Sequence, residues 1–138
     1  MKLEICRKAL IIAVLFLSAL GFEASAQQQK AEEPDLYEQA EAEADRLQRI
    51  LDLEDWQTFY VDSTLKHDYP AMMEEMEKLR AAKITNVDIF QDVQDKWWDS
   101  IDASYRKIFN DEQWKAYLKT GAGKAQKLRE KRKAKKEE

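Results

Sequence analysis

The sequence predicts an all-α protein, either a kinked helical hairpin or a small bundle of about four helices. The 138 residues combine 36% charged and 44% hydrophobic residues with only three Gly and two Pro. Apolar side chains recur at spacings of three and four, which places them on one face of a helix. Several acidic residues precede a Lys or Arg by four positions, as in Asp62/Lys66 and Glu74/Lys78, and such pairs stabilise helices.

The first 26 residues have the features of a secretory signal peptide. Basic residues precede an apolar run from Ala9 to Leu20, and Ala24-Ser25-Ala26 matches a cleavage site. An uncleaved anchor is the alternative, but the run is shorter than the roughly 20 residues of a spanning helix. We therefore expect cleavage after Ala26 and export from the cytoplasm. A polar, disordered leader is expected over 27–34.

A helical domain is expected over residues 35–121. Its first helix is predicted over 35–51, where five apolar residues share one face: Leu36, Ala40, Ala44, Leu47 and Leu51. A second helical segment begins near Glu54. Pro70 predicts a kink or break there, because proline lacks an amide hydrogen and disfavours helical geometry at the preceding residue. The helical pattern ends over 83–86.

The clearest predicted element is an amphipathic helix over 88–109. Phe90, Val93, Trp97, Ile101 and Ile108 form its apolar face. The opposite face carries five aspartates, which we call the acidic ridge: Asp88, Asp92, Asp95, Asp99 and Asp102. The ridge is either a docking surface, for a basic partner, cations or this protein's own basic tail, or a solvated face. We favour the solvated face.

The last predicted helix begins near Asn110, and Gly121-Ala122-Gly123 is expected to end it before a basic tail over 122–138. Residues 27–123 hold 12 basic and 22 acidic residues, net −10, whereas residues 124–138 hold eight basic and three acidic ones, net +5. Export excludes nucleic acid as a partner of the tail. Weak contact with anionic lipid, an acidic client and a solvated end remain, and the solvated end is the simplest expectation.

The sequence carries no recognisable catalytic or metal-binding motif. It has no Gly-rich phosphate loop, nucleophile elbow or Cys-x-x-Cys pair. His67 is the only imidazole, and a lone histidine without a second nitrogen or sulfur ligand is usually structural. We therefore expect no enzymatic activity, no cofactor and no metal site.

Aromatic and Met side chains are the candidate binding residues. Trp97 and Trp98 are neighbours that point about 100° apart on a helix, so both cannot face the centre of one seam. Trp and Met are enriched at interfaces, although core packing is their default role. We assign a candidate client- or partner-binding surface to Trp56, Met72, Met73, Met76, Trp97 and Trp98.

Two short motifs resemble those of a known family. Residues 51–57, LDLEDWQ, are similar to the L-x-L-T-x-x-Q motif of the Spy/CpxP family of small exported helical proteins. Residues 108–113, IFNDEQ, resemble its second copy, I-L-T-x-x-Q. Glu54 and Asn110 stand where the family has Thr, and Asn caps a helix N-terminus far better than Glu does. The resemblance implies that Leu53, Gln57, Asn110 and Gln113 shape helix junctions and are not catalytic.

The resemblance also implies an ATP-independent chaperone or envelope-stress adaptor, typically an antiparallel dimer. We predict a non-enzymatic, homodimeric periplasmic protein that binds unfolded or partly folded exported proteins. The alternative is a structural or adaptor protein that docks one specific envelope protein through the acidic ridge or the tail. A metal-binding sensor is the third hypothesis.

Overall fold

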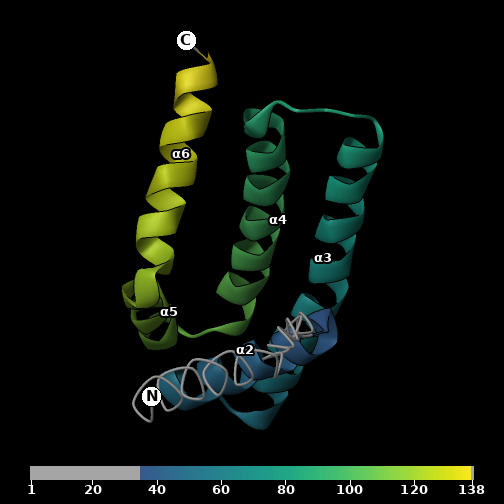
Figure 1. Ribbon diagram of the computed structural model, residues 1–138. Helices are drawn as coiled ribbons and strands as arrows, with labels where there is room; N and C mark the ends of the chain where they lie inside the picture. The colour runs from purple at the N-terminus through teal and green to yellow at the C-terminus, as the bar shows by residue number, and fades with distance from the viewer. Residues whose placement is uncertain (1–34, 138) are drawn as a thin grey trace, which may run out of the picture. The chain divides into compact units, whose positions relative to one another are not determined.

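The computed structural model describes residues 35–137 (Figure 1). Every described residue belongs to one compact unit, Glu33–Glu138. The predicted signal peptide and leader lie outside the described residues. The described part is helical without strands, which confirms the predicted class. No helix in it combines the length and apolarity needed to cross a membrane.

Four longer helices and one short helix make up this unit. They are α2 (Leu36–Leu51), α3 (Asp55–Ala81), α4 (Val87–Ile108), the short α5 (Asp111–Tyr117) and α6 (Gly123–Glu137), with a π-helical turn, η1 (Leu118–Ala122), between the last two. The helices α3 and α4 form an antiparallel hairpin, α2 packs against α3, and α6 runs beside α4 (Figure 1).

Side chains cap the helix starts as the sequence suggests. The Asp35 carboxylate accepts the Tyr37 amide at the start of α2, and the Asn86 side chain accepts the Asp88 amide at the start of α4. Residues 82–86 form the loop between α3 and α4, where the helical pattern was expected to end.

Pro70 does not break α3. The helix continues from Asp55 to Ala81 with the proline inside it, so the predicted break is absent. Leu65 is fully buried before the proline, and Met72, Met73 and Met76 are half-buried after it. Packing on both sides outweighs the local cost of one missing backbone donor.

The core is a single apolar cluster built by α2, α3, α4, α5 and the segments between them. Tyr105, Phe109 and Tyr117 pack with ring centroids 5.1–5.8 Å apart. Four of the five apolar residues predicted for the first helix are buried, and Leu36 is half-buried. The buried cluster consists of Ala40, Ala44, Leu47, Leu51, Leu53, Val61, Leu65, Ile101, Tyr105, Phe109 and Tyr117.

Candidate functional site

Two glutamines join the two motif segments at the base of the helical hairpin. Gln57 lies in the first turn of α3 and is only 3% exposed, and Gln113 lies in the first turn of α5. Their carboxamides pair reciprocally: Gln57 Nε2 donates to Gln113 Oε1 at 2.8 Å, and Gln113 Nε2 donates to Gln57 Oε1 at 3.0 Å. We call this pair the glutamine clasp.

The remaining hydrogen-bonding capacity of the clasp is used by backbone groups. Gln57 Nε2 also donates to the Ile108 carbonyl at 2.9 Å, and Gln113 Nε2 donates to the Asp52 carbonyl at 3.3 Å. The two Oε1 atoms accept the backbone amides of Glu54 and Asn110 at 2.9 and 3.0 Å. All four carboxamide N–H groups are therefore satisfied. The clasp joins the α2–α3 junction to the end of α4 and the start of α5.

The clasp explains why Glu54 can stand at a helix start despite being a poor cap. Its backbone amide is satisfied by Gln57 from within the helix, which is half of a capping box. At α5 both halves are present, since Asn110 Oδ1 also accepts the Gln113 amide at 2.9 Å. The four motif residues thus lie at helix junctions, and one of them, Leu53, is buried in the core.

No protein family, curated protein or solved structure matches this chain. The resemblance to the Spy/CpxP family therefore stays a prediction based on the two motifs.

The acidic ridge lies against α6. Going along α4, Asp92 pairs with Lys136, Asp95 with Arg132, and Asp99 with both Lys133 and Arg129. The Arg132 guanidinium donates two hydrogen bonds to the Asp95 carboxylate, at 2.6 and 2.7 Å, and Asp95 is only 6% exposed. Because residue numbers rise along α4 as they fall along α6, the two helices run antiparallel through a row of ion pairs.

The most buried ion pair of this row joins Asp102 to Arg129. Arg129 is 5% exposed and is the only buried residue of α6. Asp102 also accepts Tyr117 Oη at 2.6 Å and Gln126 Nε2 at 2.9 Å. Burial, together with the hydrogen bond to Asp102, raises the pKa of Tyr117, so the phenol stays a neutral donor to the carboxylate.

Opposite charges lower the pKa values of two ridge aspartates, Asp95 and Asp99. The Arg132 hydrogen bonds hold the pKa of Asp95 below its ordinary value. Burial alone would raise the pKa of Asp99, but the contacts with Lys133 and Arg129 outweigh it and lower that pKa. These charge-assisted pairs between the facing sides of α4 and α6 fix the register between the two helices.

The expectation of a solvated ridge and a solvated tail is wrong for this part of the chain. Asp95 and Asp102 are buried, Asp99 is half-buried, and only Asp88 and Asp92 are exposed. The tail is helical and docks on the ridge, which is one of the alternatives considered for it. The signal lay in spacing, because the acids of one segment and the bases of the other both recur at three and four residues. Gly121, with φ of 107°, interrupts the helical backbone, so the preceding helix ends there as predicted, and a separate helix, α6, begins at Gly123.

The six predicted binding residues do not form one surface. Trp98 packs edge-on against Tyr69 with centroids 6.2 Å apart and borders the core. Trp97 Nε1 donates to Glu75 across the α3–α4 hairpin at 2.9 Å. Trp56 lies 16 residues from Met72 on the same helix, about 24 Å along its axis. The three Met side chains are half-buried.

The structure instead shows an exposed aromatic patch that includes Trp56 and two residues the sequence reasoning missed. Trp56, Phe59 and Tyr60 are 50%, 65% and 53% exposed at the start of α3. Their rings touch edge to face, with centroids 6.2 Å apart for Trp56–Tyr60 and 5.8 Å for Phe59–Tyr60. We call these three residues the aromatic patch. Their spacing of three and four was the available signal.

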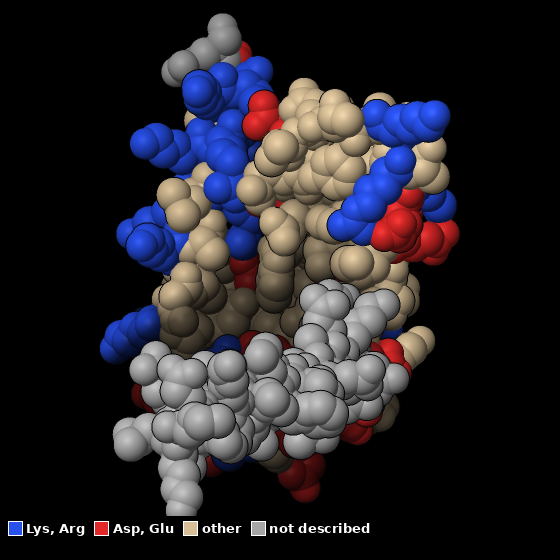
Figure 2. Space-filling view, in the orientation of Figure 1, with Lys and Arg blue, Asp and Glu red and all other residues tan. Residues whose placement is uncertain are grey.

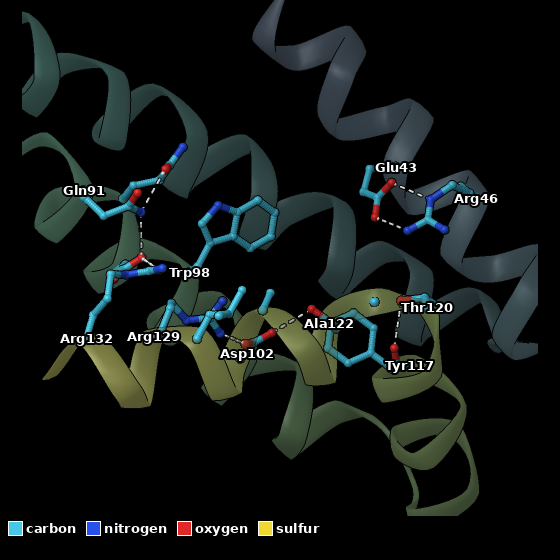
Figure 3. A pocket seen from close by; sticks show the side chains of 15 residues that line it. Glu43, Arg46, Gln91, Trp98, Asp102, Tyr117, Thr120, Ala122, Arg129 and Arg132 are labelled. Atoms are coloured by element: carbon cyan, nitrogen blue, oxygen red, sulfur yellow. Dashed lines mark hydrogen bonds and ion pairs between the residues drawn. The ribbon is translucent and has the colours of Figure 1, made fainter. Parts of the chain in front are cut away.

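A groove of about 380 Å³ lies between α2, α4 and the start of α6 (Figure 3). Trp98 and Tyr117 contribute aromatic surface to its lining. Its six charged side chains neutralise one another, since they form three pairs: Glu43–Arg46, Asp95–Arg132 and Asp102–Arg129. The groove therefore offers a ligand no unpaired charge.

His67 is exposed, and its Nδ1 lies 2.7 Å from Asp68 Oδ1. Within residues 35–137, no group of three or more His, Cys, Asp or Glu side chains could hold a metal ion. The described histidine therefore has no ligand set around it.

Proposed function

We propose that this chain is a non-enzymatic binding protein that holds apolar segments of unfolded or partly folded proteins on the aromatic patch. The observation that carries the proposal is the exposure of three adjacent aromatic side chains, each at least 50% exposed, on one face of α3. Monomeric proteins rarely leave large apolar side chains gathered in this way unless the surface binds something.

The patch lies on a helix face that the fold does not need. Gln57, Val61 and Leu65 are buried on one side of α3. At 100° per residue, Trp56, Phe59 and Tyr60 point roughly to the opposite side. A helix that is apolar on two faces is normally buried on both. Here the second face is available to a partner.

The patch is also organised before a partner arrives. Trp56 Nε1 donates to the Glu54 carboxylate at 2.7 Å, which satisfies the indole and leaves the ring itself exposed. The two edge-to-face contacts restrict the ring rotamers. Restricting side chains in advance lowers the entropy lost on binding.

The chemistry of the patch favours clients with exposed apolar segments. Aromatic rings contact many different apolar side chains without a fixed hydrogen-bond pattern, which suits variable sequences. The family resemblance supports the same function, an ATP-independent chaperone or stress adaptor in the periplasm that acts as a homodimer. Binding to the patch needs no nucleotide.

The structure gives less support to the alternative of an adaptor that docks a partner through the acidic ridge. A basic partner would have to displace Arg129, Arg132, Lys133 and Lys136 from the acidic ridge. Such a partner would break several ion pairs, one of which, Asp102–Arg129, is buried. Removing one partner of a buried ion pair costs about 3–5 kcal/mol.

An aggregation assay tests the proposal. Reduced lysozyme serves as the unfolded client, and light scattering is followed without nucleotide at near-stoichiometric amounts of the chain. We expect the unaltered chain to suppress scattering, and the triple variant W56Q/F59Q/Y60Q to lose most of that effect. Gln keeps helix propensity while removing the rings.

The matched control replaces three equally exposed apolar residues away from the patch, Y37Q/V87Q/L128Q. It removes a similar amount of exposed apolar surface and should suppress scattering like the unaltered chain. Equal scattering with and without the unaltered chain would refute the proposal, as would equal losses in the two triple variants. Circular dichroism of both variants checks that the helices remain.

A further inference from the structure

We propose that the outer face of α6 is a docking surface for a membrane that carries anionic phospholipid head groups. This surface is separate from the aromatic patch and does not depend on the function proposed above. It consists of four lysines that we call the lysine stripe: Lys124, Lys127, Lys131 and Lys135.

The basic residues of α6 are sorted onto two faces. Arg129, Arg132, Lys133 and Lys136 face α4 and pair with the acidic ridge. The lysine stripe recurs at spacings of three and four, and at 100° per residue it occupies an arc of about 80° on the opposite side. Figure 2 shows Lys and Arg side chains gathered along α6.

The stripe has no partner within the described part of the chain. All four lysines are exposed, and no described acidic side chain forms an ion pair with any of them. The ridge aspartates that could neutralise them are already paired with the inner face. The stripe therefore presents four positive charges without an ion-pair partner, in a row about 16 Å long. Two exposed glutamates of α6, Glu130 and Glu137, flank it and reduce the net charge of this face to about +2.

The residue types favour a lipid surface over other anionic partners. Both arginines of α6 are used on carboxylates, where their planar, bidentate donors fit best. The basic residues of the outer face are all flexible lysines, which act as point charges and respond to a surface potential more than to one shaped group. It has no aromatic ring for stacking bases. Leu128, 47% exposed, lies beside the stripe and can contact the head-group region.

The ion pairs with α4 make the stripe a fixed surface instead of a loose basic end. A disordered tail would lose conformational entropy on binding a membrane, whereas α6 is already helical and held on the ridge. Binding through the stripe leaves every one of those ion pairs intact. The proposal therefore predicts membrane binding without any change in helix content.

Vesicle co-sedimentation tests this proposal with the full chain. The vesicles contain either zwitterionic lipid alone or the same lipid with 30% anionic phospholipid, at low salt. We expect binding to the anionic vesicles only, and a loss of binding of at least about tenfold in K124Q/K127Q/K131Q/K135Q, because each lysine near an anionic surface contributes separately. Raising the salt should weaken binding of the unaltered chain.

The matched control removes the same number of positive charges elsewhere. Four exposed basic residues form no ion pair with a described residue: Arg49, Lys83, Lys107 and Lys115. The variant R49Q/K83Q/K107Q/K115Q therefore keeps the stripe and loses the same four positive charges as the stripe variant. Every variant carries the same first 34 residues, whose contribution is therefore common to all. The control should bind anionic vesicles like the unaltered chain.

Three outcomes would overturn the proposal. The first is equal binding to zwitterionic and anionic vesicles, and the second is equal loss in the stripe and control variants. The third is binding of the unaltered chain to a single-stranded oligonucleotide or to polyglutamate but not to anionic vesicles. Circular dichroism of both quadruple variants shows whether α6 remains helical, and a vesicle-bound spectrum equal to the free one is expected.

Discussion

Replacing Gln57 by Leu should strongly destabilise the fold, although the two side chains have similar volumes. The substitution removes two donated and two accepted hydrogen bonds, and it leaves the Ile108 carbonyl and the Gln113 carboxamide without their partners. Each such bond contributes about 0.5–1.5 kcal/mol, and an unsatisfied buried group costs about 1–3 kcal/mol. Because Gln113 is only half-buried and can regain water, we expect a loss of about 2–4 kcal/mol in the free energy of unfolding.

Urea unfolding followed by circular dichroism at 222 nm measures this loss. With a slope of about 1–2 kcal/mol per molar urea, the midpoint should fall by more than about 1 M. The double variant Q57L/Q113L should lose less than the sum of the single variants, by about 1–2 kcal/mol, because no unpaired carboxamide remains. The exposed Gln94 supplies the control, and Q94L should stay within about 0.5 kcal/mol of the unaltered chain. A loss below about 1 kcal/mol for Q57L, or strictly additive losses, would refute the role assigned to the glutamine clasp.

Acid should release α6 before the core unfolds. Because the folded pKa values of Asp95 and Asp99 are lowered, the folded state binds fewer protons than the unfolded state, and these aspartates stabilise the fold above their unfolded pKa of about 3.9. That stability is lost as the pH falls through the folded pKa values, so amide exchange over 123–137 should accelerate below about pH 4 while α3 stays protected. Unchanged protection of α6 down to pH 2 would contradict this. Gly121→Ala should cost about 1–3 kcal/mol in urea unfolding, because its φ of 107° strains any residue with a Cβ even though nothing lies within 4 Å of that position. A neutral substitution there would show that the bend into α6 does not require glycine.

The helical class and most element bounds could be predicted because apolar periodicity reports burial directly. Leu47, Val61 and Ile101 lie on the predicted apolar faces and are fully buried. The two motifs marked the helix junctions for the same local reason, since capping depends on residues three apart. Nothing in either motif, however, showed that Gln57 and Gln113 would meet across 56 positions of sequence.

Apolar periodicity could not reveal the docking of α6. That helix has almost no apolar face, and Arg129 is its only buried residue. It is held by charge pairs whose partners lie 27 to 44 positions away in sequence. The acidic ridge was found as a pattern, but its pairing with the tail was one of several open alternatives. The sequence left a kink or a break open at Pro70, and the break is absent because packing on both sides of the proline stabilises α3.

The aromatic patch was only partly found for a related reason. Trp56 was selected for its residue type, whereas Phe59 and Tyr60 were not among the candidate binding residues. Their exposure follows from the side of α3 that α2 and α4 cover, which depends on tertiary packing.

The central claim is that the aromatic patch of α3 contacts unfolded clients, and site-specific photo-crosslinking tests it most directly. A photoreactive phenylalanine derivative replaces either Tyr60, 53% exposed in the patch, or Tyr37, 51% exposed on α2. Each protein is irradiated with reduced lysozyme and, separately, with folded lysozyme. We expect strong crosslinks from position 60 to the reduced client only, and few from position 37. Equal yields at the two positions, or no crosslink from position 60, would contradict it.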